Sequence, residues 1–330
     1  MTESLKGVNL GGWLVLEKWM TPSLFKGTSA RNEFELSKTE QGRGRIKQHH
    51  KTFITEDDLQ WLKSQGIQIL RVPIGYWVFG DDKRYVGAIE QLDWLVDTSL
   101  SYGFKLLLDL HAAPGAKNKT AHSGSGNTNR NIHSTKWLND FAAQDKTIVT
   151  LEKLARRYRH SPNIWGIELL NEPIIDRFGL KLARFHRRAY KRLITVARPG
   201  THIVFSDAYA PLLTTNTFWL RANKKFPVIM DCHIYQVFGA KNAKMTFNQH
   251  VKRTTLTKYF LKLLRFQQPI IIGEWSAMLP SGVGPSQTHE YVRRQLDAFS
   301  TTKAQFYWSY KTEADGRWNY RDMAEKDLLQ

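Results

Sequence analysis

The chain has 330 residues, 42% of them hydrophobic, which is enough for the large core of a single domain. No apolar run reaches the roughly 18 residues of a membrane-spanning helix, and the one cysteine, Cys232, excludes an internal disulfide. The formal net charge of +18 can attract nucleic acid, anionic lipid or acidic polysaccharide, but no base-stacking motif accompanies it, so nucleic-acid binding is not expected.

The chain begins with a segment, 1–6, that contains no apolar stretch of the kind a secretion signal needs. A protein with this start is expected either to stay in the cytoplasm or, if a leader has been removed, to act outside the cell. The rest of the sequence favours neither compartment.

Eight short apolar runs follow one another along the chain and are predicted to be β-strands. They cover residues 6–10, 67–74, 105–111, 164–172, 202–207, 228–235, 269–275 and 305–310. Amphipathic segments that favour helices lie between them, at 55–65, 88–102, 144–159, 180–197, 246–266 and 287–299. This alternation is typical of a parallel sheet, and eight units predict an α/β fold, the (β/α)8 TIM barrel, as one catalytic domain over residues 1–330.

The connections between these elements carry further expectations. Two of them, 11–53 and 112–140, are long enough to form walls around the end of the barrel, whereas 208–226 has a poor helix pattern. His49 and His50 are expected in a polar loop, without the ligand spacing of a metal site. The densest positive charge, from Arg177 to Arg198, is predicted to be the solvated face of an outer helix, and Cys232 a small buried hydrophobe.

Two glutamates, Glu172 and Glu274, end the fourth and seventh runs. In an eight-stranded barrel these strands face each other across the mouth, where the carboxyl ends of the strands form the active site. The two carboxylates are therefore predicted on opposite sides of one cleft. Glycoside hydrolysis needs such a pair, one protonated and one ionised, roughly 5–5.5 Å apart in retaining enzymes, and needs no cofactor or metal.

Other polar residues end the neighbouring runs. Arg71 is expected to keep a nucleophilic carboxylate ionised, Tyr235 to hydrogen-bond it, and His111 and His233 to orient the carboxylates and contact sugar hydroxyls. Glu168 is predicted to point into the barrel and pair with a basic group. A single glutamate at a strand end is more often a salt-bridge partner than a catalyst, but five such strand ends together indicate an active site.

The motifs Leu170-Asn171-Glu172-Pro173 and Ile272-Gly273-Glu274-Trp275, with Arg71, His111, His233, Tyr235 and Trp308 at matching strand ends, resemble glycoside hydrolase family 5 along essentially the whole chain. The resemblance implies that Glu172 is the acid/base and Glu274 the nucleophile. It also implies that Asn171 hydrogen-bonds the sugar 2-hydroxyl and that Trp308 is the floor of the subsite for the non-reducing glucose.

A narrower resemblance, to fungal exo-β-1,3-glucanases, is carried by residues 7–17, 20–25, 71–77, 111–115 and 308–313. It implies that Glu17 binds hydroxyls of the terminal glucose and closes the pocket, as an exo-acting enzyme requires. Phe238 matches one of two phenylalanines that clamp the next glucose. The other would fall near Lys119-Thr120-Ala121, where no aromatic residue stands, so the linkage preference stays open.

The sequence thus predicts a retaining exo-acting β-glucosidase that releases glucose from β-1,3-glucan. One alternative keeps the mechanism and acts on β-1,6- or β-1,4-linked glucan or another β-glucoside. Another is a non-catalytic carbohydrate- or nucleic-acid-binding barrel, against which the presence of both glutamates counts. Trp77 and Trp275 are further candidates for stacking on sugar.

Overall fold

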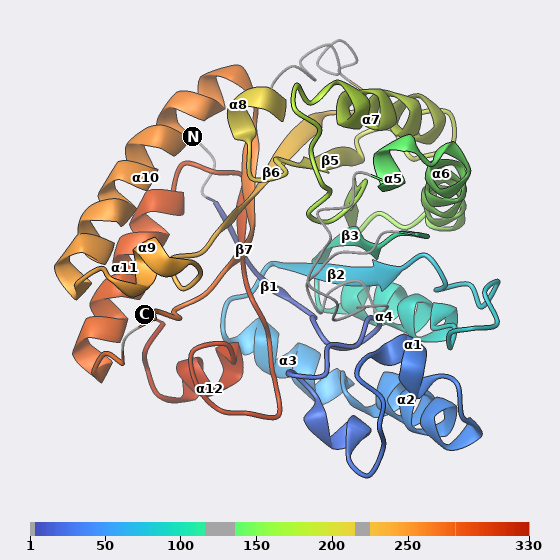
Figure 1. Ribbon diagram of the computed structural model, residues 1–330, viewed down its shortest axis with the longest axis horizontal. Coiled ribbons are helices and arrows are strands. Elements are labelled where there is room, and N and C mark those ends of the chain that lie inside the picture. Colours follow the sequence, from blue (N-terminus) through green and yellow to red (C-terminus); the bar gives the residue numbers. More distant parts are fainter. Residues whose placement is uncertain (1–3, 116–135, 215–224, 281, 330) are drawn as a thin grey trace.

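The computed structural model describes residues 4–115, 136–214, 225–280 and 282–329. Eight parallel strands form a closed barrel in which each strand pairs with the next and β1 pairs with β8 (Figure 1). The strands are β1 (Leu5–Asn9), β2 (Ile69–Gly75), β3 (Lys105–Ala112), β4 (Ile164–Glu168), β5 (His202–Ser206), β6 (Val228–Ile234), β7 (Ile270–Trp275) and β8 (Ala304–Tyr307). The predicted (β/α)8 TIM barrel is confirmed.

Helices surround the barrel in Figure 1, and the six predicted from the sequence are present. They are α3 (Glu56–Ser64), α4 (Ile89–Ser101), α6 (Phe141–Arg157), α7 (Leu180–Leu193), α10 (Phe247–Gln267) and α11 (Pro285–Phe299). The further helical elements are η1 (Pro22–Phe25), α1 (Glu33–Leu36), α2 (Glu40–Thr52), α5 (Lys136–Asn139), α8 (Pro211–Thr214), α9 (Ala240–Ala243) and α12 (Tyr320–Glu325). Thr55 and Thr246 begin α3 and α10 with capping boxes, which satisfy backbone N–H groups that have no partner within the helix. None of the described helices combines the length and apolar character needed to cross a bilayer.

The barrel interior changes character along its axis. An apolar layer contains Ile69, Leu107, Val204, Ile229, Ile271 and Phe306. Side chains on a strand alternate between its two faces, so the next inward position lies two residues further on. At that level four strands carry the buried charged residues Arg71, Asp109, Glu168 and Asp231. The hydrophobic outward faces pack against the helices, and burial on both sides explains the continuous apolar runs of the sequence.

Three predictions about local structure were wrong. The fourth strand ends at Glu168 rather than at 172, although the N–H groups of Leu169 and Asn171 still donate hydrogen bonds to carbonyl oxygens of the neighbouring strands β5 and β3. The connection 11–53 contains η1, α1 and α2, so it is not a plain loop. His49 and His50 lie on α2 and are buried, the first with Nε2 2.7 Å from the carbonyl oxygen of Gly12. The helix is easily missed because its sequence is polar and contains two glycines.

The basic stretch lies on α7, whose buried face consists of Leu182, Phe185, His186, Ala189, Tyr190 and Leu193. Its opposite face carries the arginines, as predicted. Arg192 is 2.5 Å from Glu152 of α6, and Arg188 also pairs with an acid of that helix, Asp145. Part of the positive charge here is therefore neutralised within the fold.

Candidate active site

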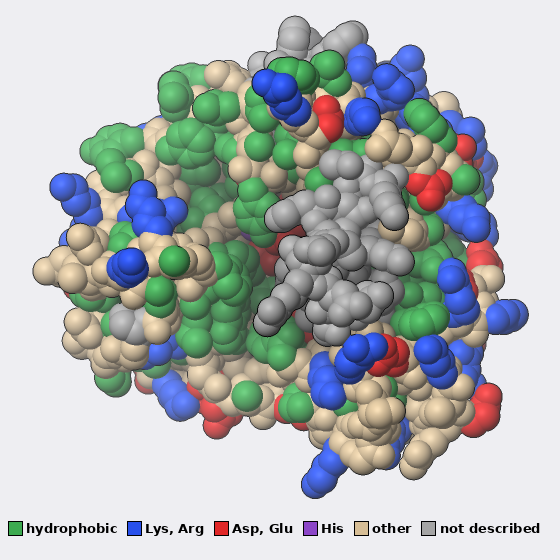
Figure 2. Space-filling model, in the orientation of Figure 1, with side chains coloured by type: hydrophobic (Ala, Val, Ile, Leu, Met, Phe, Trp, Pro, Cys, Tyr) green, Lys and Arg blue, Asp and Glu red, His purple; other side chains and the backbone are tan. Residues whose placement is uncertain are grey.

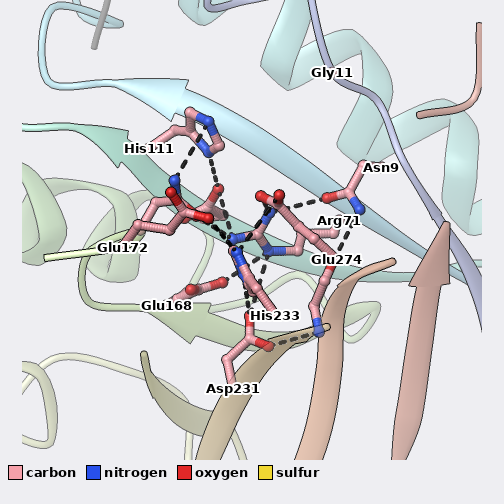
Figure 3. Close-up of polar contacts among 12 residues, drawn as sticks. Asn9, Gly11, Arg71, His111, Glu168, Glu172, Asp231, His233 and Glu274 are labelled. Atoms are coloured by element: carbon pink, nitrogen blue, oxygen red, sulfur yellow. Dashed lines mark hydrogen bonds and ion pairs between the residues drawn. The ribbon is translucent and has the colours of Figure 1, made fainter. Parts of the chain in front are cut away.

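Arg71 lies at the centre of the barrel, at the third position of β2 rather than at its end, and has no exposed surface (Figure 3). Its guanidinium is 2.8 Å from Glu168, 3.1 Å from Asp109, 3.1 Å from Glu274 and 3.7 Å from Asp231. Burial opposes the charge, but these carboxylates raise the pKa of Arg71 well above its usual range. A permanent cation therefore stands below the candidate catalytic pair, and the predicted pairing of Glu168 with a basic group is confirmed.

Two asparagines complete the surroundings of Arg71. Its Nη1 and Nη2 donate hydrogen bonds to Oδ1 of Asn9 (2.9 Å) and Oδ1 of Asn171 (2.8 Å). Asn9 in turn donates to the carbonyl oxygen of Gly273 (2.8 Å), whose N–H donates to Asp231 (2.6 Å). A Cβ at position 273 would lie 1.9 Å from the Asp231 carboxylate, so this approach requires glycine directly before Glu274.

Glu274 is buried at the end of β7, and both of its carboxylate oxygens accept hydrogen bonds. Arg71 donates to Oε1 (3.1 Å) and the hydroxyl of Tyr235 donates to Oε2 (2.9 Å). Burial raises the pKa of Glu274, and the charges of His233 and Arg71 counter this effect. The two donors fix the plane of the carboxylate, so its position in the site is set before any substrate arrives.

Glu172 follows β4 by four residues, with a φ of 39° in the left-handed region that costs a residue with a side chain on the order of 1–3 kcal/mol. Its Oε1 is 2.7 Å from Nδ1 of His233 and accepts a short hydrogen bond from the hydroxyl of Tyr209. A carboxylate oxygen of Glu172, one of Glu274 and a ring nitrogen of His233 all lie within 4.8 Å of one another. Such a short separation of the two carboxylates is typical of retaining enzymes, in which one carboxylate attacks the sugar directly. In inverting enzymes the two carboxyl groups are roughly 6.5–9.5 Å apart, which leaves room for a water molecule.

His233 stands between the two glutamates. Burial lowers its pKa, but the charges of Glu274 and Asp231 and a hydrogen bond with Glu172 raise the pKa well above its usual range. Two trios of donor atoms, Glu172–His233–Glu274 and Glu168–Asp231–His233, are close enough together to hold a cation. His233 belongs to both trios, so the two share one imidazole at the centre of the site.

His111 and Trp308 lie side by side at one edge of the site. The two rings are stacked, with centroids 5.5 Å apart and planes at 9°. Nδ1 of His111 is 2.6 Å from Asp109, and its Nε2 is 3.5 Å from the amide nitrogen of Asn171. Trp308 also lines the cavity, so its ring, which is stacked on His111, lies beside the glutamates.

The site opens into a cavity of about 930 Å³. Its wall includes aromatic, apolar and ionisable side chains from several elements: Trp19, Glu172, Asp207, Tyr209, Pro211, Cys232, His233, Ile234, Tyr235, Gln236, Phe238, Arg253, Thr257, Phe260, Leu261, Glu274, Trp308 and Trp318. Such a cavity is large enough for more than one sugar ring.

Aromatic rings surround the mouth of this cavity. Phe238 is 61% exposed, with its ring 5.5 Å from Tyr235 and 6.0 Å from Trp318. Trp19 lies 5.7 Å from Trp318 and donates a 2.7 Å hydrogen bond to the buried carboxylate of Glu17. The structure therefore brings the predicted site residues to one region, with Glu17 behind Trp19.

Several side chains were assigned wrongly or missed at the level of sequence. Trp77 is stacked on Tyr85 at 4.0 Å, and Trp275 packs against Phe299, so neither is available to a sugar. Trp275 follows Glu274 on the strand and therefore points to the opposite face. The positions near Lys119-Thr120-Ala121 lie outside the described residues.

Tyr209, Trp19 and Trp318 line the cavity but were not predicted, because they come from segments without a regular pattern. Asp231 could have been found, since it lies two residues after an inward apolar position of β6. Cys232 is buried, as predicted, and burial raises the pKa of its thiol, which disfavours a nucleophilic thiolate.

Comparisons with known proteins agree with this geometry. Residues 28–314 match the model of the family described as cellulase (glycosyl hydrolase family 5). A probable glucan 1,3-beta-glucosidase A of Aspergillus niger is 30% identical, over 99% of this chain and 88% of that protein. The glucan 1,3-beta-glucosidase of Kluyveromyces lactis is 28% identical, over 98% and 88% of the two chains.

Solved structures share the fold at lower identity. A rutinosidase from Aspergillus niger superposes with a TM-score of 0.85 and 19% identity, over 100% of this chain and 98% of that chain. An endoglucanase from Thermotoga maritima gives a TM-score of 0.61 and 15% identity, over 98% and 96% of the two chains. Identity at this level supports the shared barrel and not a shared substrate.

Proposed function

Because the chain belongs to glycosyl hydrolase family 5, and is therefore a glycoside hydrolase, we propose that it is a retaining exo-acting β-glucosidase that releases glucose from the non-reducing end of β-1,3-glucan. The observation that carries the proposal is the pair Glu172 and Glu274, whose carboxylate oxygens meet within 4.8 Å around His233. The names of the relatives in Aspergillus niger and Kluyveromyces lactis support the glucan linkage.

In the first step Glu274 attacks the anomeric carbon while the carboxyl of Glu172 gives its proton to the glycosidic oxygen. The bond to the leaving sugar breaks and a glucosyl ester of Glu274 forms. In the second step Glu172 takes a proton from water, and the resulting hydroxide displaces Glu274. Two inversions at the same carbon give glucose with its original configuration.

The surroundings of the pair favour this exchange of roles. Forming the ester removes the negative charge of Glu274, which favours the ionised form of Glu172 that the second step needs as its base. Arg71 and Tyr235 hold the Glu274 oxygens, and stabilise the carboxylate again when it leaves the sugar. His233 and Tyr209 bind Oε1 of Glu172 and orient its carboxyl toward the cavity.

The remaining side chains fit a subsite for one terminal glucose. Trp308 would form its floor, and Asn171, which is oriented by Arg71, would bind the 2-hydroxyl. Glu17 and His111 would bind further hydroxyls, and Glu17 would close the end of the pocket. A closed end explains why the enzyme would act on chain ends only.

Product analysis on laminarin tests the exo mode and the stereochemistry together. Glucose as the only early product, with the β-anomer appearing first in the proton NMR spectrum, is the expected result. A ladder of oligosaccharides would indicate endo action, and α-glucose as the first product would overturn the retaining mechanism.

A second linkage is the main rival. The ring of Trp318 lies between those of Phe238 and Trp19, 6.0 Å and 5.7 Å from them, an arrangement that differs from a clamp of two phenylalanines. The donor subsite does not distinguish a β-1,6- or β-1,4-linked glucan, or another β-glucoside, because it contacts only the terminal sugar. Cleavage of gentiobiose at a rate equal to or above that of laminaribiose would reject the β-1,3 assignment.

A further inference from the structure

The cavity extends beyond the catalytic pair along β6 toward α8 and α10, and this part of its wall is apolar. Pro211, Ile234, Phe260 and Leu261 contribute side chains without hydrogen-bonding groups. Figure 2 shows hydrophobic side chains gathered over these elements and around the hollow beside them. A glucose ring bound here would bring several hydroxyls to a surface that offers them few partners.

The polar side chains in this part of the wall are engaged with the protein. Oε1 of Gln236 is 3.0 Å from Nδ1 of His250, and Thr257 donates to the carbonyl oxygen of Arg253 (3.0 Å). The guanidinium of Arg253 donates to Asn242. Because buried hydroxyls without partners cost free energy, this part of the wall favours an apolar group over a sugar ring, whereas the aromatic rings at the mouth remain available to a glucan.

We propose that this apolar part of the leaving-group side also accepts an apolar aglycone, so that β-glucosides of apolar alcohols are substrates of this enzyme in addition to glucan. The reaction is the hydrolysis already described: Glu172 protonates the oxygen of the departing alcohol, and water supplies the atoms that complete glucose and the alcohol. The inference rests on the proposed retaining β-glucosidase activity and specifies its substrate class.

The test compares soluble β-glucosides that differ only in their alcohol. The kcat/KM of octyl β-glucoside, below its micelle-forming concentration, is expected to exceed that of methyl β-glucoside at least about tenfold. Phe260→Ser is expected to reduce this ratio about fivefold or more, whereas Phe141→Ser, which changes a similarly exposed phenylalanine outside the cavity, leaves it unchanged.

The outcomes separate this inference from the function on which it rests. Equal kcat/KM values for the octyl and methyl glucosides, with glucose still released from laminarin, would overturn the apolar-aglycone proposal alone. No glucose from any β-glucoside would overturn the proposed function itself.

A different observation, on the outer side of α10, points to a surface for a partner. Leu256, Tyr259, Leu263 and Phe266 follow one another at helical spacing and are 60%, 64%, 61% and 80% exposed. They form a second apolar stripe, opposite the buried residues His250, Thr254, Leu261 and Leu264. An apolar stripe of this length on the exposed face of a helix typically marks an interaction site.

The charge carried by α10 itself is entirely positive, although one of its lysines, Lys258, pairs with Asp297 of the neighbouring helix α11 (2.7 Å). Helix α10 has no acidic residue, and between 208 and 273 the chain contains ten lysines and arginines but one acid, the buried Asp231. Lys262 lies 5.9 Å from the ring of Tyr259, and Arg265 lies 5.9 Å from that of Phe266. Apolar side chains flanked by cations match the chemistry of an anionic lipid surface.

We infer that the α10 stripe binds membranes that contain anionic lipid. In a flotation assay the protein is expected to bind vesicles of phosphatidylcholine with phosphatidylserine, and to bind pure phosphatidylcholine vesicles at least about tenfold less. The double variant Leu263→Ser, Phe266→Ser is expected to lose this binding. The matched double variant Phe178→Ser, Leu180→Ser, which changes two residues that are each 60% exposed at the start of basic α7, is expected to keep it.

Binding that is the same with and without phosphatidylserine, or is lost equally in both double variants, would overturn this inference. A second result would also overturn it: a wild-type protein that sediments as a dimer and does not bind vesicles, together with an α10 double variant that sediments as a monomer. The stripe would then belong to contacts between copies of the chain.

Discussion

The two walls of the active-site cavity differ in what holds them in place. On the barrel side, Arg71, His233 and their carboxylate partners are buried and hold one another through hydrogen bonds and ion pairs. On the helical side, Pro211, Phe260 and Leu261 are apolar. Their side chains have to fit their neighbours in shape but have no hydrogen-bonding groups that need partners. The barrel interior therefore constrains the chemistry, whereas the choice of leaving group can vary with the helical wall.

The difference should also be visible in energies. A buried charge that loses its partner destabilises a protein by about 3–5 kcal/mol, because the remaining charge has no solvent to compensate it. Truncating a partly exposed apolar side chain costs much less. Substitutions in the barrel wall are therefore expected to have large effects, and those at the cavity mouth small ones.

The largest effect is expected at the two glutamates. Glu274→Ala should lower kcat/KM by about 10⁴-fold or more, since no nucleophile remains, and Glu172→Ala by about 10²–10⁴-fold. Added azide distinguishes the two roles. It should restore turnover of an activated β-glucoside in both variants, giving α-glucosyl azide with Glu274→Ala and β-glucosyl azide with Glu172→Ala. The opposite configurations would exchange the assigned roles.

Arg71→Met tests the buried charges of the barrel wall. It leaves four acidic groups without their shared cation, so the free energy of unfolding is expected to fall by about 3–5 kcal/mol in urea denaturation. The control Arg192→Met removes an arginine that is 59% exposed and pairs with Glu152, and should cost at most about 1 kcal/mol. Equal stability of both variants would show that the two walls do not differ in this way.

The barrel wall was also the part of the site that the sequence predicted best. Arg71, His233 and Glu274 lie in apolar strands and Glu172 follows one, and strands buried on both faces produce unmistakable apolar runs. The boundary after β4 was misplaced by four residues, because the apolar Leu169 and Leu170 continue the pattern after the sheet ends.

The cavity mouth could not be predicted in the same way. Tyr209 and Trp318 lie in segments without periodicity, and whether such a ring faces a cavity or the core depends on contacts between residues far apart in the chain. Trp77 was assigned to the site for this reason and proved to be packed against Tyr85. Residue type alone did not separate the two environments.

Asp207 also lines the cavity, and its carboxyl group makes the stability of the folded protein depend on pH. Burial raises the pKa of Asp207 to about 7, so the folded protein binds this proton more tightly than the unfolded chain. The stabilisation is complete below about pH 4 and is lost as the pH rises through 7. The variant Asp207→Asn cannot release a proton at this position, so it does not lose this stabilisation as the pH rises. Its free energy of unfolding, relative to that of the wild type, should therefore increase by on the order of 2–4 kcal/mol between pH 4.5 and 8. Parallel pH profiles of the two proteins in urea denaturation would contradict this.

The smallest effect is expected at Phe238, which is 61% exposed at the mouth. Phe238→Ala removes an aromatic contact worth about 0.5–1.5 kcal/mol, so the KM for laminaritriose should rise about 2–10-fold with little change in kcat. Glucosyl fluoride, whose leaving group does not reach the mouth, should be unaffected. Phe178→Ala, 60% exposed on another part of the surface, is the matched control and should change neither substrate. A parallel rise in KM for both substrates would place Phe238 with the donor subsite instead, and no change at all would assign the acceptor glucose to Trp19 and Trp318.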